Sequence, residues 1–354
     1  MGGNERIMAK KMKAAVLTKL RTIEVQELDV PTPGPDEALV RIRACGLCGS
    51  DVHYFEHGKI GPYVVTKPII LGHEAAGEVV AVGSEVRNVA PGQRVTIEPG
   101  VTCGRCEYCK SGRYNLCPEV RFLATPPYDG AFCEYIAIRA DFLYPIPDSM
   151  SYEKAALIEP LSVGLHAVNR GGLKTGETVV IMGMGPIGMM TLLAAKAAGA
   201  GRVIGVDLEA FRLERALQMG ADGVVNLREE DGMEAILRLN GGRKADLAIE
   251  TAGNGKAAQA SLQAVRRGGR VVLVGLPQEE ATPVSIPYIV DNEIEIRGVF
   301  RYHNTYPTGV AVMAAENLNL DPIITDRMTL DEAPLAFEKA IHEKNRTLKI
   351  VIEP

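Results

Sequence analysis

The chain carries no thiol in its second half, because all seven cysteines of its 354 residues lie at or before Cys133. This absence excludes a thiolate ligand from the later segments. The first residues, Met1 to Arg6, lack the apolar core of a secretory signal, so we expect a cytoplasmic protein. In such a reducing compartment, closely spaced cysteines indicate metal binding rather than disulfides.

Two further absences concern the partners of the protein. The net charge of −5 gives no basic surface for nucleic acid. The uncharged run from Thr178 to Ala195 approaches the length of a membrane span, but three glycines and Pro186 interrupt it. We therefore expect neither nucleic acid nor a membrane as a partner, and we interpret this run as a strand, a turn and a helix.

Two patterns of apolar residues follow one another along the chain, whose length is typical of about two domains. Residues 13–45 alternate apolar and polar side chains between proline and glycine turns, and this character continues to 94–97, which predicts antiparallel β structure. From Gly176 onward, strand, turn and helix repeat, which predicts an α/β fold with a doubly wound parallel sheet. The strands expected in that sheet are 178–182, 202–207, one near Val224, 245–250, 270–275 and 294–300.

Four cysteines lie close together at spacings of three, three and eight residues: Cys103, Cys106, Cys109 and Cys117. This spacing suits a closed tetrahedral zinc site. The surrounding segment is rich in Gly, Lys and Arg and has little apolar material to fold around, so a metal would supply the missing folding energy. We predict a structural zinc. The alternatives are four unligated thiols and an iron–sulfur cluster.

A second metal site is indicated by Gly72-His73-Glu74, which directly follows an apolar run, and by Cys48 upstream. A buried carboxylate needs a cation, a donor or a metal. Cys48, His73 and one carboxylate would supply three protein ligands to a catalytic zinc and leave one position open. Glu74 and Glu159 compete for the third position.

Two of these residues have structural alternatives. The alternative for Glu74 is an ion pair with an arginine, either Arg94 or Arg121, behind the metal ligands. The alternative for His53, five residues after Cys48, is an exposed histidine on the surface.

A nucleotide-binding loop is indicated by Gly183, Gly185 and Gly188, which lie between a predicted strand and a predicted helix. The glycines permit a sharp turn and close approach of a pyrophosphate, whose charge the helix N-terminus favours. Asp207 ends the next strand, 19 positions after Gly188, where it can bind both ribose hydroxyls and repel a 2′-phosphate. This favours NAD over NADP. Arg212 could pair with such a phosphate, or could be an exposed helix charge or stack on adenine, and a packing turn without nucleotide is the alternative for the glycines.

Beyond residue 12 the chain resembles the zinc-dependent medium-chain dehydrogenases, specifically their sorbitol (L-iditol) 2-dehydrogenase and polyol dehydrogenase branch. The resemblance rests on segments that occur in a fixed order along the chain. They are Cys48-Gly49-Ser50-Asp51-Val52-His53-Tyr54, Gly72-His73-Glu74, Gly112-Arg113-Tyr114-Asn115-Leu116, Ala124-Thr125-Pro126-Pro127, Ile158-Glu159-Pro160-Leu161-Ser162-Val163-Gly164 and Gly298-Val299-Phe300-Arg301-Tyr302.

This resemblance implies a GroES-like, mainly-β catalytic domain formed by both chain ends, residues 1–158 and 302–354, with a zinc lobe at about 100–118. By the same resemblance, residues 159–301 are expected to form the NAD-binding Rossmann domain. It also implies two zinc ions per chain, a catalytic one on Cys48, His73 and Glu74 and a structural one on Cys103, Cys106, Cys109 and Cys117. Members of this branch are usually homotetramers.

Further roles come from the resemblance residue by residue. It implies that Glu159 contacts the zinc-bound water or the substrate, and that Tyr54, Arg301 and Tyr302 contact polyol hydroxyls. Glu159, Ser50 and His53 are the candidate proton relays. The implied NAD contacts beyond the glycines are Ile187, Asp207, Arg212, Val274, Gly275, Leu276, Val299, Phe300 and Arg301.

The expected reaction is the reversible, NAD-linked oxidation of a secondary alcohol of a small polyol to a ketose. Sorbitol to fructose and xylitol to xylulose are reactions of this type. One alternative is another secondary alcohol on the same machinery, such as threonine or 2,3-butanediol. A remote alternative is a non-catalytic, NAD-binding structural protein.

Overall fold

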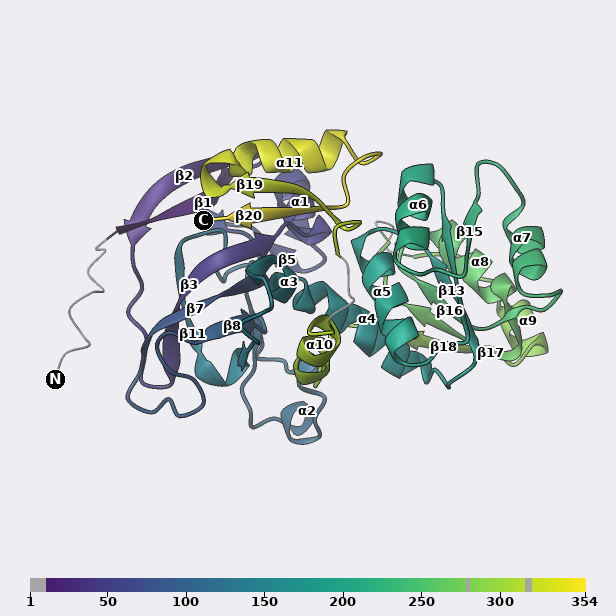
Figure 1. Ribbon diagram of the computed structural model, residues 1–354, viewed down its shortest axis with the longest axis horizontal. Coiled ribbons are helices and arrows are strands. Elements are labelled where there is room, and N and C mark those ends of the chain that lie inside the picture. Colours follow the sequence, from purple (N-terminus) through teal and green to yellow (C-terminus); the bar gives the residue numbers. More distant parts are fainter. Residues whose placement is uncertain (1–10, 278–280, 316–319) are drawn as a thin grey trace. The chain divides into compact units, whose positions relative to one another are not determined.

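The computed structural model describes residues 11–277, 281–315 and 320–354, and the chain divides into two compact units (Figure 1). The first unit comprises Met1–Glu159, Tyr306–Leu318 and Ile324–Pro354, and the second comprises Pro160–Thr305 and Asn319–Ile323. Both ends of the chain therefore belong to the first unit. The predicted domain limits, 158/159 and 301/302, lie one and four residues before the corresponding boundaries of the structure. The prediction also assigned residues 320–323 to the first unit, whereas the structure groups them with the second.

Antiparallel strands build most of the first unit. One sheet has the strand order β2-β1-β6, and a seven-stranded sheet has the order β12-β8-β7-β3-β20-β19, with β11 also paired to β3. The last strand, β20, pairs with β3 and so completes a sheet that the early part of the chain begins (Figure 1). The bounds are β1 (Lys11–Lys19), β2 (Thr22–Asp29), β3 (Glu37–Gly46), β6 (Ile69–Ile70), β7 (Glu74–Val82), β8 (Arg94–Ile97), β11 (Tyr135–Arg139), β12 (Leu143–Pro145), β19 (Ile324–Thr329) and β20 (Lys349–Glu353).

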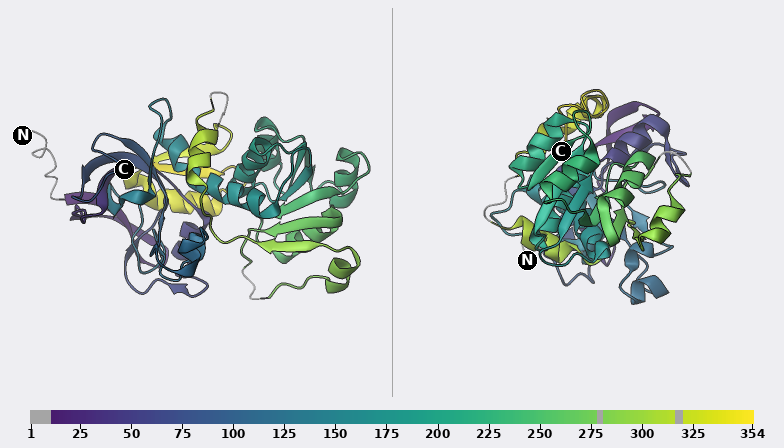
Figure 2. Two further views of the ribbon diagram at one scale, coloured as in Figure 1. Left: turned by 90° about the horizontal axis from the view of Figure 1, so that it is seen from below. Right: turned by 90° about the vertical axis from the view of Figure 1, so that its right-hand side faces the viewer.

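Short helices and two small hairpins complete the first unit. The helices are α1 (Gly49–His57), α2 (Glu107–Lys110), α3 (Tyr152–Ala156), α10 (Tyr306–Met313) and α11 (Ala333–His342), with a 3-10 turn at Tyr114–Leu116. The hairpins join β4 (Lys59–Ile60) to β5 (Tyr63–Val64), and β9 (Gly100–Val101) to β10 (Arg121–Phe122). The segment between β9 and β10, which contains α2, protrudes from the sheets of this unit as a lobe (Figures 1 and 2).

The core of the first unit joins segments from both chain ends. The ring of Phe337, on α11, lies 4.9 Å from that of Phe55 and 6.1 Å from that of Phe132. All three side chains are at most 2% exposed. Burial of one such side chain contributes roughly 1.5–3 kcal/mol, so these contacts hold the C-terminal segment on the β-sheets that carry the candidate ligands.

The second unit is a six-stranded parallel sheet of order β15-β14-β13-β16-β17-β18, with α5 and α6 on one face and α7 and α8 on the other (Figure 1). The strands are β13 (Thr178–Met182), β14 (Arg202–Asp207), β15 (Gly223–Asn226), β16 (Ala245–Glu250), β17 (Val265–Leu273) and β18 (Glu295–Gly298). The helices are α4 (Ile158–Gly171), which enters this unit at Pro160, α5 (Pro186–Ala197), α6 (Ala210–Gln218), α7 (Gly232–Leu239), α8 (Gly255–Ala264) and α9 (Ile286–Asp291). This is the expected doubly wound α/β fold.

The direction of strand addition reverses between β13 and β16, which are neighbours at the middle of the sheet. Open α/β sheets bind their ligands at the carboxyl ends of the strands at such a switch point. The helix α5, which contains most of the apolar run examined as a membrane span, covers this sheet. Within the described parts of the chain, no helix combines the length and the apolar character that crossing a bilayer requires.

Candidate active site

Two neighbouring strands of the first unit bring three metal-binding side chains together. The register of β3 and β7 places Gly46 opposite Glu74, the first residue of β7. Cys48 follows β3 as the N-cap residue of α1, and His73 immediately precedes β7. As a result, the ligand atoms of Cys48, His73 and Glu74 lie within 4.8 Å of one another. His73 and Glu74 are buried, so the electrostatic interactions of this cluster are weakly screened by solvent.

Asp51, for which no separate role was predicted, organises this cluster. Its buried carboxylate accepts a hydrogen bond from the backbone N–H of Cys48 and another from that of Gly72, each at 3.0 Å. One of its oxygens also lies 3.6 Å from Nδ1 of His73. A carboxylate beside one ring nitrogen fixes the tautomer of a histidine and leaves the other nitrogen to bind a metal.

The charges around His73 are those of a cation-binding site. Burial lowers the pKa of His73, but the neighbouring Asp51 and Cys48 outweigh burial and raise this pKa well above its ordinary value. A metal ion satisfies the same negative charges while the imidazole stays neutral.

Glu74 has a buried partner that the sequence did not suggest. The ammonium of Lys349, on β20, donates to both carboxylate oxygens of Glu74 at 2.7 Å and to the carbonyl of Leu47 at 3.0 Å. The side chains of Lys349 and Glu74 are 2% and 0% exposed. The arginine partners considered for Glu74 are therefore wrong: Arg94 instead donates to the backbone carbonyls at 147, 148 and 150, and Arg121 is not the partner either.

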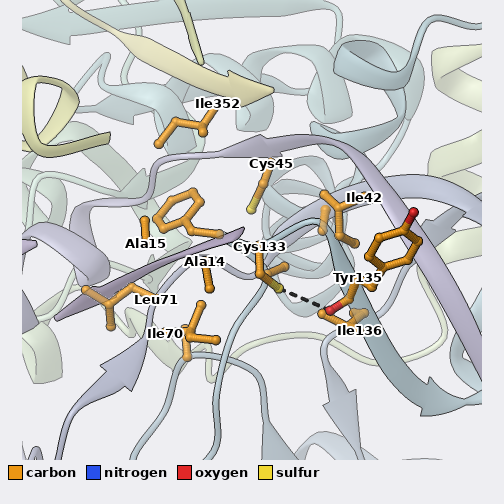
Figure 3. Close-up of a cluster of buried hydrophobic side chains, with 14 of the residues drawn as sticks. Ala14, Ala15, Ile42, Cys45, Ile70, Leu71, Cys133, Tyr135, Ile136 and Ile352 are labelled. Atoms are coloured by element: carbon orange, nitrogen blue, oxygen red, sulfur yellow. Dashed lines mark hydrogen bonds between the residues drawn. The ribbon is translucent and has the colours of Figure 1, made fainter. Parts of the chain in front are cut away.

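The donor set of the cluster fits zinc, since a thiolate, an imidazole and a carboxylate are three typical protein ligands of a catalytic zinc. The other two thiols near these strands do not join it. Cys45 and Cys133 lie among buried apolar side chains, and the Sγ of Cys133 lies 3.3 Å from the carbonyl of Tyr135 (Figure 3). Burial raises the pKa of Cys133 to about 12 and that of Cys45 well above its ordinary value, so neither is a thiolate.

Two of the three candidate proton relays, Ser50 and His53, lie on α1, the helix whose N-cap residue is Cys48. Ser50, His53 and Tyr54 are spaced three and four residues apart, on one face of this helix. Burial and then the charge of His57, whose ring lies 4.7 Å away, lower the pKa of His53. His53 is half-buried rather than fully exposed, and Tyr54 is 3% exposed.

Glu159 is buried at the start of α4, but it is not among the residues whose ligand atoms approach within 4.8 Å. The charge of Glu159 still acts on Lys349, the partner of Glu74. Burial lowers the pKa of Lys349, and the charges of Glu74, then Cys48 and then Glu159 raise it, with a net rise. Of the two carboxylates considered as the third ligand, the structure brings Glu74 next to Cys48 and His73.

The four cysteines of the lobe converge as a second cluster, with ligand atoms within 4.8 Å of one another. The Sγ of Cys109 lies 4.0 Å from that of Cys103 and 3.5 Å from that of Cys106. Backbone N–H groups of the lobe point at the sulfurs: those of Cys103, Cys106 and Cys109 donate to Cys117, Cys103 and Cys106. Donation from the N–H groups of residues 105 and 106 lowers the pKa of Cys103 to about 7. Sulfurs that accept N–H donors and converge in this way fit a closed zinc site.

A buried carboxyl group ties the lobe to the sheet. Tyr114 of the lobe and Tyr144 of β12 donate their hydroxyls to the two oxygens of Glu98, at 2.8 and 2.9 Å. Glu98 is 1% exposed. Burial raises its pKa to about 7, although the two tyrosine donors act in the opposite direction.

In the second unit, the glycine loop has the geometry that a nucleotide requires. Gly183 has a φ of 98°, and a Cβ there would meet Ala252 at 2.9 Å. A Cβ on Gly188 would meet the carbonyl of Gly183 at 1.9 Å, so the helix packs closely on the strand. A Cβ on Gly185 would meet nothing within 4 Å, which leaves room for a ligand at the N-terminus of α5.

Asp207 is held rigidly at the end of β14. Its carboxylate accepts N–H donors from Met184 at 2.7 Å, Leu208 at 2.7 Å and Glu209 at 2.9 Å. Arg212 lies 3.6 Å from one of its oxygens. Leu208 and Glu209 donate to the same oxygen, whereas the oxygen that accepts from Met184 has a further lone pair with which it can accept a ribose hydroxyl.

The remaining cofactor candidates follow the carboxyl ends of neighbouring strands. Residues 274–276 follow β17 and residues 299–301 follow β18, at the same edge of the sheet as the glycine loop. A Cβ on Gly275 would meet the backbone of Gly253 at 2.2 Å. Arg301 lies over the ring of Phe300 at 4.8 Å, and Tyr302 is buried. The structure thus gathers the candidate NAD residues at one edge of the second unit and the candidate metal ligands in the first unit.

A mixed-ligand metal centre in one unit and a glycine-rich nucleotide loop in the other define a class, that of metal-dependent, nucleotide-linked dehydrogenases. Residues 34–148 match the family described as alcohol dehydrogenase GroES-like domain, and residues 186–315 match the zinc-binding dehydrogenase family.

Comparison with known proteins identifies a branch within this class of dehydrogenases. The chain is 53% identical over 343 residues to the sorbitol dehydrogenase of Bacillus subtilis (strain 168), with 97% of each chain covered. It is 45% identical over 333 residues to the sorbitol dehydrogenase of Homo sapiens, covering 94% of this chain and 92% of the human protein. The solved structure of 2R,3R-butanediol dehydrogenase from Bacillus subtilis matches with a TM-score of 0.88 at 31% identity, covering 97% and 99% of the two chains. The chain therefore belongs to the zinc-dependent medium-chain dehydrogenases, in their sorbitol dehydrogenase branch.

Proposed function

We propose that this enzyme oxidises a secondary alcohol of a small polyol to a ketose, reversibly and with NAD as the hydride acceptor. Sorbitol to fructose and xylitol to xylulose are the expected reactions. The observation that carries the proposal is the cluster of the half-buried Cys48 with the buried His73 and Glu74, in a chain 53% identical to a sorbitol dehydrogenase. A zinc ion bound by these residues would act as a Lewis acid that lowers the pKa of the alcohol.

The residues around the cluster have distinct tasks. Asp51 fixes the ring of His73 and the start of α1, so the thiolate and the imidazole keep their relative positions. Glu159, Ser50 and His53 are proposed to carry the alcohol proton to solvent, because one is a buried carboxylate and His53 has a lowered pKa that favours its neutral, proton-accepting form. Tyr54, Arg301 and Tyr302 are proposed to bind the remaining hydroxyls of the polyol.

We propose NAD rather than NADP as the cofactor. Three backbone N–H donors hold the carboxylate of Asp207 at the end of β14, where it would accept a ribose hydroxyl and repel a 2′-phosphate. Arg212 is drawn to this carboxylate and is thereby partly neutralised as a phosphate partner. The same argument predicts that Asp207→Ser raises the kcat/KM with NADP relative to NAD.

The experiment is a steady-state assay of the purified enzyme with sorbitol, xylitol, threonine and 2,3-butanediol, each with NAD and with NADP. The proposal predicts the highest kcat/KM for a polyol with NAD, and a loss of kcat in Glu159→Gln that is larger than its change in KM. Undiminished kcat in Glu159→Gln would remove that residue from the proton path. A preference for NADP would overturn the cofactor assignment.

A second candidate substrate is a vicinal diol such as 2,3-butanediol. The likeness to the 2R,3R-butanediol dehydrogenase structure, with a TM-score of 0.88, favours it. A higher kcat/KM for 2,3-butanediol than for any polyol in the same assay would select this candidate. Failure to reduce either nucleotide with every alcohol would favour the non-catalytic alternative.

We also propose that the enzyme is a cytoplasmic homotetramer. The edge strand β18 and the helix α9 expose large apolar side chains that a second copy would cover: Ile286 at 61%, Val290 at 67% and Ile296 at 40%. Seven unpaired cysteines agree with a reducing compartment. Light scattering on the purified protein tests the assembly, and a monomeric mass would contradict it.

A further inference from the structure

Lys349 occupies a position that a lysine rarely takes, as the buried first residue of β20, directly before the apolar run Ile350-Val351-Ile352. Its side chain is 2% exposed, and all three of its N–H donors have acceptors: both oxygens of Glu74 and the carbonyl of Leu47. An ammonium so fully enclosed has lost its hydration, which costs several kcal/mol that the ion pair only partly offsets.

Packing alone does not explain this pair. Apolar residues of similar size usually replace a buried ion pair without loss of stability, and often with a gain. The backbone also makes room for the carboxylate, because a Cβ on Gly46 would meet an oxygen of Glu74 at 2.1 Å. The chain thus keeps both a buried cation and a glycine around one carboxylate of the metal cluster.

The pair bears directly on metal binding, because a zinc ion in the cluster would share Glu74 with the ammonium of Lys349. Both of its oxygens accept from Lys349 at 2.7 Å, while its ligand atoms also lie within 4.8 Å of those of Cys48 and His73. Each N–H donor stabilises the negative charge of the oxygen that it contacts, lowers the basicity of the carboxylate and so weakens that oxygen as a metal ligand. The ammonium also repels a divalent ion bound on the other side of the carboxylate. Both effects weaken the binding of a metal ion by Glu74.

We propose that Lys349 is a positioning residue that keeps Glu74 a weak and exchangeable ligand of the catalytic zinc. With Glu74 held by Lys349, Cys48 and His73 remain the firm ligands, and the carboxylate can yield its place when an alcohol oxygen enters. The proposal rests on the proposed function, because it takes the cluster of Cys48, His73 and Glu74 as the zinc site.

The test measures zinc affinity and zinc release in the full-length enzyme by competition with a chromophoric chelator. Lys349→Met, which keeps the length of the side chain and removes its charge, is expected to bind the catalytic zinc on the order of 10-fold more tightly and to release it more slowly. Lys349→Arg keeps the charge and is expected to stay near wild type. Lys339→Met, which removes another ion-paired lysine of the first unit, is the matched control and should leave zinc affinity unchanged.

A double-mutant cycle separates this effect from general loss of stability. Lys349→Met should tighten zinc binding only when Glu74 is present, so the gain disappears in the Lys349→Met, Glu74→Gln double variant. With Co²⁺ in place of zinc, Lys349→Met should shift the visible absorption bands, whereas Lys339→Met should not. Should Lys349→Met fold poorly without metal, Lys349→Gln provides the same comparison.

Equal or weaker zinc binding in Lys349→Met than in wild type would overturn the proposal, as would a gain that persists without Glu74. Failure of the zinc site itself has a different signature. In that case Cys48→Ser would retain as much zinc per chain as wild type, whatever the result for Lys349.

Discussion

The two candidate zinc sites lie in the same unit and differ in almost every physical property. The lobe site has four thiols on a protruding segment, with backbone N–H groups pointed at the sulfurs. The other site has one thiol, one imidazole and one carboxylate, and buried charged side chains hold its ligands. The first arrangement suits a closed metal site, in which a bound metal would stabilise the fold of the lobe. In the second arrangement, neighbouring charged side chains hold the ligands: Asp51 lies beside His73, and Lys349 forms an ion pair with Glu74.

The largest expected effect is the loss of stability of the lobe when its metal site is removed. The lobe has little apolar core of its own, so Cys106→Ser should release its zinc and unfold the lobe, removing binding energy of about 10 kcal/mol or more. Limited proteolysis should then cut within residues 100–122 while the sheets stay resistant. Resistance of this segment in the metal-free variant would show that the lobe folds without zinc.

The next effect separates the sites by activity. Cys48→Ser should lower kcat/KM by about 1,000-fold or more, because the lost metal would stabilise the alkoxide by several kcal/mol. Its thermal stability should change much less than that of Cys106→Ser. Cys45→Ser is the matched control, because Cys45 is a buried thiol of the same sheet that does not join the cluster. Loss of activity in both variants alike would indicate a packing defect rather than loss of a ligand.

A third prediction concerns the contact that ties the lobe to the sheet. Folding raises the pKa of Glu98 from 4.5 to about 7, so the folded state binds the proton more tightly than the unfolded state does. Stability from this group is therefore fully present below pH 4.5 and is lost as the pH rises to about 7, by at most about 3 kcal/mol. Glu98→Gln removes the titrating group, so its unfolding free energy should fall less than that of wild type between pH 4.5 and about 7. The measurement is the difference in unfolding free energy between the variant and wild type at each pH. A difference that does not vary over this range would contradict the argument.

The smallest effect concerns the support of His73. Asp51→Asn keeps the shape of the side chain but removes its charge, so zinc affinity at the mixed-ligand site should fall by about 10- to 100-fold. This change is opposite in sign to that expected for Lys349→Met, while the zinc of the lobe should be unaffected in both. Chelator competition measures the zinc affinity of the two variants side by side. A change of the same sign in both zinc affinities would contradict the opposite roles assigned to Asp51 and Lys349.

The fold was largely predictable from the sequence where local patterns are strong. β13 and β14 have the predicted bounds, 178–182 and 202–207, because buried apolar runs lie between clear glycine turns. β17 begins at Val265 rather than at Arg270, because the exposed residues near its start, Arg266 to Gly268, have the composition of a loop. The zinc-dependent dehydrogenase class followed from motifs whose spacing is local.

The site was predictable only as far as its ligands. Asp51 lies three residues from Cys48, and this acidic residue in the first turn of a helix was the signal that it holds the backbone of the ligand. Lys349 lies 275 residues from Glu74, and only the pairing of β20 with β3 brings the two together. A charged residue within the apolar run that ends the chain was the available signal, but a sequence does not reveal which buried carboxylate such a lysine meets.

The most direct test of the account is metal analysis of the purified enzyme together with turnover of sorbitol and NAD. The account predicts two zinc ions per wild-type chain, one per Cys48→Ser chain, and formation of NADH and fructose by the wild type alone. Equal zinc content in the two proteins, or no NADH from fully zinc-loaded wild type with any polyol, would contradict it.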